Sequence, residues 1–148
     1  MSPDERGDTY NETPLHCVYS SLDAEDESRA ACRRLLVEAG ANVNARDRYG
    51  DNVLIYATSG WIKKSTTKTL EVLLLLGGAD MHATDRKLRT PLHRAAHSNN
   101  PDAIVLLLRA GAPVNTRDDN GHTPLESAME EGNRRNYPLL LRAGSAIP

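Results

Sequence analysis

Two histidines, His93 and His97, lie four residues apart in the stretch TPLHRAAH. On a helix this spacing puts both imidazoles on one face, where they could hold a metal ion. The zinc-protease signature needs a glutamate directly after the first histidine, to act as general base, and Arg94 stands there instead. No third ligand is evident, so we expect neither a metal nor any other cofactor.

Other catalytic patterns are missing from the sequence as well. It contains no Gly-x-Ser-x-Gly turn for a nucleophilic serine and no glycine-rich loop that would cradle a phosphate. Cys17 and Cys32 lie among apolar residues, which favours buried structural thiols over a catalytic pair. The pair Glu130-Glu131 is most simply solvated surface. The sequence therefore predicts a protein that is not an enzyme.

Composition further limits the class of protein to which the chain can belong. The chain has 148 residues, enough for one domain with a sizeable core, and a net charge of -2. That charge gives no basic field for nucleic acid. The polar start, MSPDERGDTYNE, is no signal peptide, and the longest aliphatic run, residues 103–108, is too short to span a membrane. We expect an intracellular protein, cytoplasmic or nuclear, that binds neither nucleic acid nor membrane.

The elements that must position these side chains repeat along the chain. EAGANVNARD at 38–47, LGGADMHATD at 76–85 and RAGAPVNTRD at 109–118 align, and RAGSAIP at 142–148 continues them. We expect a tail at 1–7 and one domain at 8–148, with repeats at about 8–46, 47–84, 85–117 and 118–148.

Each unit predicts two helices and a turn. A threonine before a proline is typical of a helix start, and it occurs at Thr13, Thr90 and Thr123. The second helix carries paired leucines and ends before a glycine suited to the left-handed conformation. The pairs are Leu35-Leu36, Leu73-Leu74, Leu106-Leu107 and Leu139-Leu140, and the glycines are Gly40, Gly78, Gly111 and Gly144.

The period, the TPLH motif and the GA-x-V-N motif together resemble the ankyrin repeat family over about residues 8–148. The resemblance implies an all-α solenoid of stacked helix-turn-helix units, with β-turn or hairpin fingers along one edge. In that family the histidine of TPLH bonds to the threonine at the helix start and to neighbouring backbone. It therefore implies structural roles for His16 and His93.

Three positions depart from the family pattern. Repeat 2 has Ile55 in place of the framework histidine, although Asn52 can still cap its helix. Leu88 occupies a turn position that is glycine in other repeats, so we expect an altered turn there. Pro138 falls where repeat 3 is mid-helix, so the last helix should begin late, near Asn136 or Tyr137.

Repeats 1 and 2 are longer than the others between their two helices. The span from helix start to closing glycine is 27 residues in repeat 1, 26 in repeat 2 and 21 in repeats 3 and 4. Insertions in repeat arrays often lie on a functional face. An alternative hypothesis is therefore an adaptor or inhibitor subunit that docks a larger complex through these loops. Its candidate contacts, with an outer apolar patch, are Trp61, Val72, Leu76 and Val105.

The main hypothesis is a non-catalytic protein-protein interaction module. The family arrangement implies a concave face made of finger tips and the exposed sides of first helices. Its middle is basic, its C-terminal end is acidic and two tyrosines lie toward its N-terminal end. We expect a monomer that binds a protein or peptide with an acidic segment. The candidate residues are Tyr10, Arg48, Tyr49, Asp51, Arg86, Lys87, Arg89, His97, Asp119 and His122.

Overall fold

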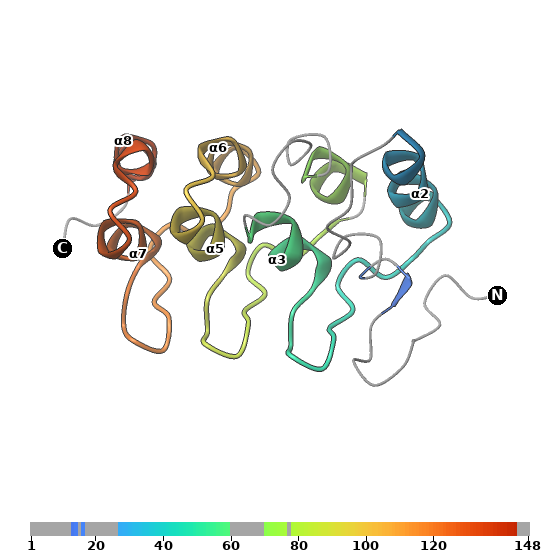
Figure 1. The fold of residues 1–148 in the computed structure, drawn as a ribbon, viewed down its shortest axis with the longest axis horizontal. Helices are drawn as coiled ribbons and strands as arrows, with labels where there is room; N and C mark the ends of the chain where they lie inside the picture. Colours follow the sequence, from blue (N-terminus) through green and yellow to red (C-terminus); the bar gives the residue numbers. More distant parts are fainter. Residues whose placement is uncertain (1–12, 15, 17–26, 60–69, 77, 145–148) are drawn as a thin grey trace.

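The computed structural model describes residues 13, 14, 16, 27–59, 70–76 and 78–144 (Figure 1). These residues form helices and loops and contain no β-strand. In chain order the elements are α2 (Glu27–Glu38), α3 (Val53–Thr58), the π-helix η1 (Val72–Leu76), α5 (Pro91–His97), α6 (Pro101–Arg109), α7 (Pro124–Glu130), the 3-10 helix η2 (Arg134–Asn136) and α8 (Tyr137–Arg142).

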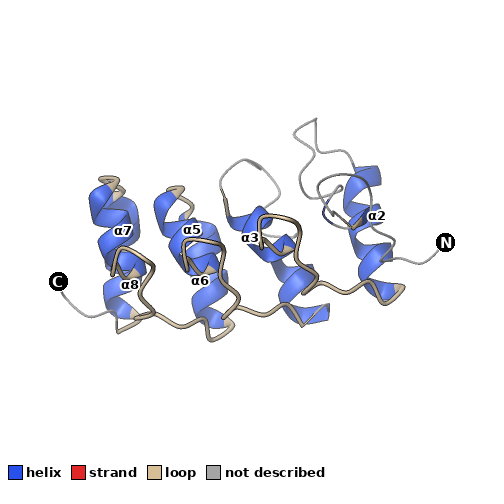
Figure 2. Cartoon of the chain, turned by 90° about the horizontal axis from the view of Figure 1, so that it is seen from below, coloured by secondary structure: helices blue, strands red, loops and turns tan. Residues whose placement is uncertain are grey.

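The helices lie in two rows (Figure 1). The outer row contains α2, η1, α6 and α8, and the inner row contains α3, α5 and α7. Long loops extend from the inner row, away from the outer one, and Figure 2 shows three of them side by side in front of the helices. We name them finger 41–52, finger 79–90 and finger 112–123. The predicted all-α solenoid with fingers is thus confirmed.

The inner helices begin at the predicted caps. The Thr90 side chain accepts a hydrogen bond from the His93 backbone N–H, and Pro91 occupies the first turn, where its missing N–H is not needed. The Asn52 side chain caps α3 by accepting from the Ile55 N–H at 3.0 Å. Repeat 2 therefore keeps its helix start without threonine, proline or histidine.

The core runs continuously between the rows. Leu73, Leu107 and Leu140 are fully buried in the outer row, and the alanines of α5 and α7 let these helices approach closely. No unit buries its apolar face alone, because each inner helix packs against the next.

Repeat 2 closes differently from repeats 1 and 3. In repeat 3 the Ala112 N–H donates to the Leu107 carbonyl, five residues back, at 2.9 Å. In repeat 2 the Ala79 N–H donates to the Leu73 carbonyl, six residues back, at 3.1 Å. One extra residue is taken up inside the helix, which widens into η1. Leu73, rather than Leu74 as the glycine alignment implies, therefore takes the buried position of Leu107.

The wider turn also changes which residue of η1 faces outward. We expected Val72 and Leu76 to do so, but Val72 is half-buried against the core and Leu75 is 80% exposed. The side chain of Leu76 lies outside the described part of the chain.

The altered turn expected at Leu88 is wrong. Leu88 adopts a φ of 57°, close to the 80° of Gly50 and Gly121 at the same place in their fingers. Its N–H still donates to the Asp85 carbonyl at 3.0 Å, as the two glycines do to their aspartates. The turn is preserved and the strain is carried by the leucine, because the finger's hydrogen bonds fix the backbone.

The late start of the last helix is confirmed. A 3-10 turn, η2, precedes α8, so that Pro138 lies in the first turn of the helix. The Asn133 and Asn136 side-chain amides anchor this irregular start by donating to the Ala96 carbonyl at 2.9 and 3.0 Å.

Candidate protein-binding surface

Each finger is held by one nearly buried aspartate at the start of its turn. Asp85 accepts hydrogen bonds through Oδ1 from the backbone N–H groups of Lys87 at 2.9 Å and Arg89 at 3.0 Å. Asp47 and Asp118 do the same in the other two fingers. Since the carboxylates fix the turns from inside, the side chains at the tips are free to face outward.

Neighbouring fingers are bonded to one another. The Arg46 guanidinium of finger 41–52 donates to the Thr84 carbonyl of finger 79–90 at 2.7 Å. The Asp119 N–H of finger 112–123 donates to the Lys87 carbonyl at 3.0 Å. The tips thus keep a defined spacing and form one preorganised surface.

Three predicted residues come together where the first two fingers meet. The guanidinium carbon of Arg48 lies 5.5 Å from the centre of the Tyr49 ring, and that of Arg86 lies 5.8 Å from it. Arg86 also donates to the Arg48 carbonyl across the gap. Tyr49 remains 44% exposed, so an aromatic ring contacted by two cations is partly accessible to solvent.

Beside this cluster lies a cleft of about 230 Å³. Its floor is an ion-pair network in which Asp85 Oδ2 lies 2.8 Å from Arg89 Nη2 and 3.6 Å from Arg94 Nη1. Burial raises the pKa of the Asp85 carboxyl, but hydrogen bonds from Arg89 outweigh it and hold the pKa below its usual value. The lining residues are Tyr49, Asp51, Asp85, Arg86, Lys87, Arg89 and Arg94.

Asp51 has a different environment in the same cleft. Burial, and then the negative charge of Asp47, raise its pKa to about 6, against the opposing charge of Arg94. Arg94 was missed by the sequence analysis, where it counted only as a residue unable to replace a catalytic glutamate. The available signal was its position four residues after the helix cap. At the same position of repeat 2, the Tyr56 hydroxyl donates to Asp47, the equivalent aspartate.

The C-terminal half of the surface carries histidine-carboxylate pairs. His97 Nδ1 on α5 lies 3.5 Å from Glu131 Oε1, just after α7. His122 Nδ1 of finger 112–123 lies 3.3 Å from Glu130 Oε2. Both predicted histidines are therefore next to acidic groups, whereas the N-terminal half presents cations.

His93, in contrast, is fully buried, and both of its ring nitrogens form hydrogen bonds to other protein atoms. Nδ1 accepts from the Thr90 N–H at 3.2 Å, and Nε2 donates to the His122 carbonyl at 2.9 Å. His16 repeats this arrangement with Thr13 and the Asp51 carbonyl. Burial lowers the pKa of His93, which favours the neutral ring. The structural role implied for these histidines is confirmed.

Some predicted residues lie outside the described part of the chain, and others lie away from this surface. Tyr10 and Trp61 lie outside the described residues, as does Cys17. Val105 lies on α6, in a hollow of the outer row. The burial expected for Cys32 is wrong, because its side chain is exposed on α2. Within the described ranges, no three potential metal ligands are grouped to hold an ion, and no helix is long and apolar enough to cross a membrane.

Comparisons with known proteins match repeats along most of the chain. A family model described as ankyrin repeats, in three copies, matches residues 62–147, and a single ankyrin repeat model matches residues 10–48. An ankyrin repeat protein of Acanthamoeba polyphaga mimivirus is 40% identical over 104 residues, covering 62% of this chain and 14% of that protein.

Two mammalian proteins match a shorter stretch. Ankyrin repeat and SOCS box protein 6 of Homo sapiens and that of Pongo abelii are each 37% identical over 67 residues, covering 44% of this chain and 16% of theirs. The matched region is thus a small part of each of these relatives.

Proposed function

Because the chain belongs to the ankyrin repeat family, whose repeats are generally protein-protein interaction modules, we propose that it binds a protein or peptide through its finger face. We define the finger face as the tips of the three fingers with the adjoining ends of α5 and α7. The observation that carries the proposal is the Arg48–Tyr49–Arg86 cluster beside its cleft. Tyrosine and arginine are among the residue types most enriched at binding hot spots.

The proposed partner carries an acidic segment. Arg48, Arg86 and Lys87 place three cations on two adjacent tips, and this concentration of like charge favours an anionic partner. An aromatic or aliphatic side chain of the partner would pack against Tyr49 while its carboxylates approach the cations. Because the fingers are bonded to each other, binding would cost little ordering of the surface.

The module is proposed to act without catalysis of its own, as a monomer, in the cytoplasm or nucleus. Ankyrin repeats are typically non-enzymatic, and the ionisable groups of the cleft already serve to fix the fingers. The alternative of an adaptor or inhibitor that docks through the inserted loops stays a prediction, because residues 17–26 and 60–69 lie outside the described ranges.

Affinity capture from the native cell tests the finger face. Proteins retained by the wild type should be lost from a variant that combines Arg48→Ala, Tyr49→Ala and Arg86→Ala. The matched control is Arg34→Ala on α2, an exposed arginine that pairs with Glu38 at 3.8 Å, which should retain them. If the triple variant retains the same proteins as the wild type, the finger face is not the binding site.

A further inference from the structure

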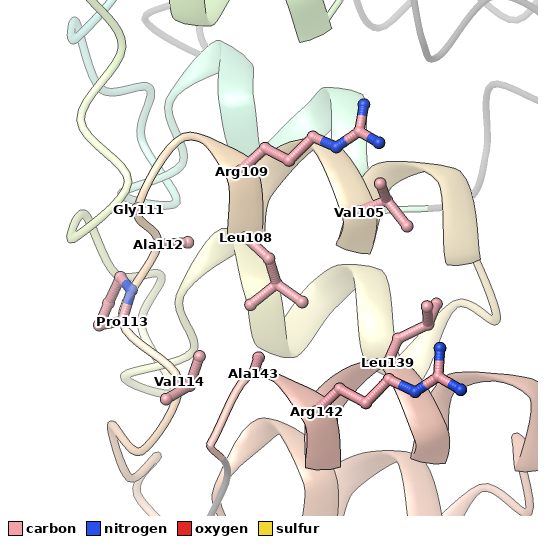
Figure 3. A pocket seen from close by; sticks show the side chains of 10 residues that line it. All are labelled: Val105, Leu108, Arg109, Gly111, Ala112, Pro113, Val114, Leu139, Arg142 and Ala143. Atoms are coloured by element: carbon pink, nitrogen blue, oxygen red, sulfur yellow. The ribbon is translucent and has the colours of Figure 1, made fainter.

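The outer row of helices carries a surface unlike the finger face. A hollow of about 600 Å³ lies between α6 and α8, closed at one end by the chain that leads into finger 112–123 (Figure 3). Val105, Leu108, Val114 and Leu139 line it and are each only half-buried. A hollow of this size, lined by accessible aliphatic side chains, is within the range of ligand sites.

We propose that this hollow binds an acidic peptide segment of a protein partner. An aliphatic side chain of the peptide inserts between Leu108 and Leu139, and neighbouring carboxylates bind Arg109 and Arg142. This site is separate from the finger face, and the proposal does not depend on it.

The charge around the hollow indicates what kind of molecule binds in it. Arg109 and Arg142 are exposed, one on each helix beside the hollow, and among the described residues neither is paired with a carboxylate. In repeat 1 the equivalent position holds Glu38, which pairs with Arg34. The segments that bear the hollow, 101–112 and 133–144, hold four arginines and one aspartate in a chain of net charge -2. The surrounding potential therefore favours an anionic partner.

A purely structural role for the two arginines explains less about where their side chains lie. Basic residues in the last turn of a helix stabilise it by interacting with the terminal carbonyls. Figure 3 shows both side chains extending away from Gly111 and Ala143, toward the end of the hollow where Val105 and Leu139 lie. The guanidinium groups thus lie beside apolar side chains, where a bound peptide would desolvate them and strengthen their attraction for carboxylates.

Peptide titration observed by methyl NMR tests the site directly. The probe is a short acetylated peptide in which two leucines are flanked by glutamates, and matched peptides carry glutamine or lysine in place of glutamate. We expect the acidic peptide to shift the methyl signals of Val105, Leu108 and Leu139, and the lysine peptide to leave them unchanged. The combined variant Arg109→Glu and Arg142→Glu should weaken binding of the acidic peptide at least about fivefold.

The matched control reverses two cations of the finger face, by Arg48→Glu and Arg86→Glu, and should leave these shifts unchanged. Three outcomes would overturn the proposal. The methyl groups could stay unshifted at millimolar peptide, the lysine peptide could bind equally well, or the shifts could survive reversal of Arg109 and Arg142. Retention of the wild type on phosphatidylglycerol vesicles that is lost on reversal of Arg109 and Arg142, without a response to the peptide, would assign the hollow to lipid instead.

Discussion

Leu88 occupies a backbone conformation that a leucine resists. The residue is 52% exposed, so burial of its side chain contributes little free energy to offset the strain. The left-handed conformation costs an L-residue about 1–2 kcal/mol, and glycine avoids that cost while losing part of the gain to its flexibility when unfolded. We expect Leu88→Gly to raise the free energy of unfolding by roughly 0.5–1 kcal/mol, measured by urea denaturation. Leu88→Ala keeps the Cβ atom and should not stabilise. A gain from alanine as large as that from glycine would contradict this explanation.

His93 predicts a dependence of stability on pH. An unfolded histidine has a pKa near 6.5, and burial lowers it in the folded protein. The unfolded chain then binds more protons below pH 6.5, so the contribution of His93 is present above that pH and is lost as the pH falls. His93→Ile copies repeat 2, which carries Ile55. Its destabilisation relative to wild type should shrink between pH 7 and pH 5 in urea titrations, and a constant difference would contradict the prediction.

Asp51 makes stability depend on pH in the opposite direction from His93. Its pKa is raised from 3.8 to about 6, so the folded protein binds the extra proton between these values. Stability from this group is present below pH 3.8 and is lost as the pH rises toward 6. Asp51→Asn removes the titration, and its stability relative to wild type should therefore increase from pH 4 to pH 7. An equal difference at both pH values would show that Asp51 titrates normally.

Among the elements, the outer helices separate buried from exposed leucines within a few residues. Leu107 is fully buried, and truncating it leaves a cavity, so Leu107→Ala should cost about 2–5 kcal/mol in the free energy of unfolding. Leu75 in η1 is 80% exposed, and Leu75→Ala should cost well under half as much. Equal losses in chemical denaturation would mean that η1 does not hold Leu75 outside the core.

Local signals predicted the elements well. Thr90 and Asn52 marked helix starts, and Pro138 marked a late one, because caps and prolines act within one turn of the chain. The extra residue of η1 was not predictable, since counting back from Gly78 assumes an unbroken α-helix. The turn at Leu88 was not predictable either, because its geometry is imposed by bonds to Asp85 rather than by the leucine.

The candidate site was predictable only in part. Repeat spacing brought Arg48, Tyr49 and Arg86 to neighbouring tips, but it could not reveal that both guanidinium groups lie over one ring. Arg94 escaped notice because its contact with Asp85 joins a helix to a finger, and side-chain direction decides that contact.

For the whole molecule, association should depend on salt. Charges at an exposed face act mainly on the association rate and are screened as the Debye length falls about threefold between roughly 0.05 and 0.5 M salt. Once a partner is captured, we expect its on-rate in stopped-flow measurements to fall by about tenfold over this range. Arg86→Glu with Lys87→Glu should slow association, whereas Tyr49→Ala should raise the off-rate. An on-rate that is insensitive to salt would exclude the basic tips as the docking surface.

Arg89 is a poor choice for such a reversal. Its guanidinium binds Asp85 at 2.8 and 2.9 Å, so Arg89→Glu would loosen the finger as well as change the surface charge. Lys87 and Arg86 change the charge with less damage to the turn.

The bonds between neighbouring fingers have a mechanical consequence. The tips lie farthest from the helices, so any change in the curvature of the solenoid is amplified there as a change in spacing between adjacent tips. Tyr49 lies across such a gap, with one cation from its own finger and one from the next. A change in the angle between these two repeats would therefore alter the distance between the Arg86 guanidinium and the Tyr49 ring. Bending of the whole stack is therefore coupled to a local change in the contacts of a single aromatic side chain, Tyr49.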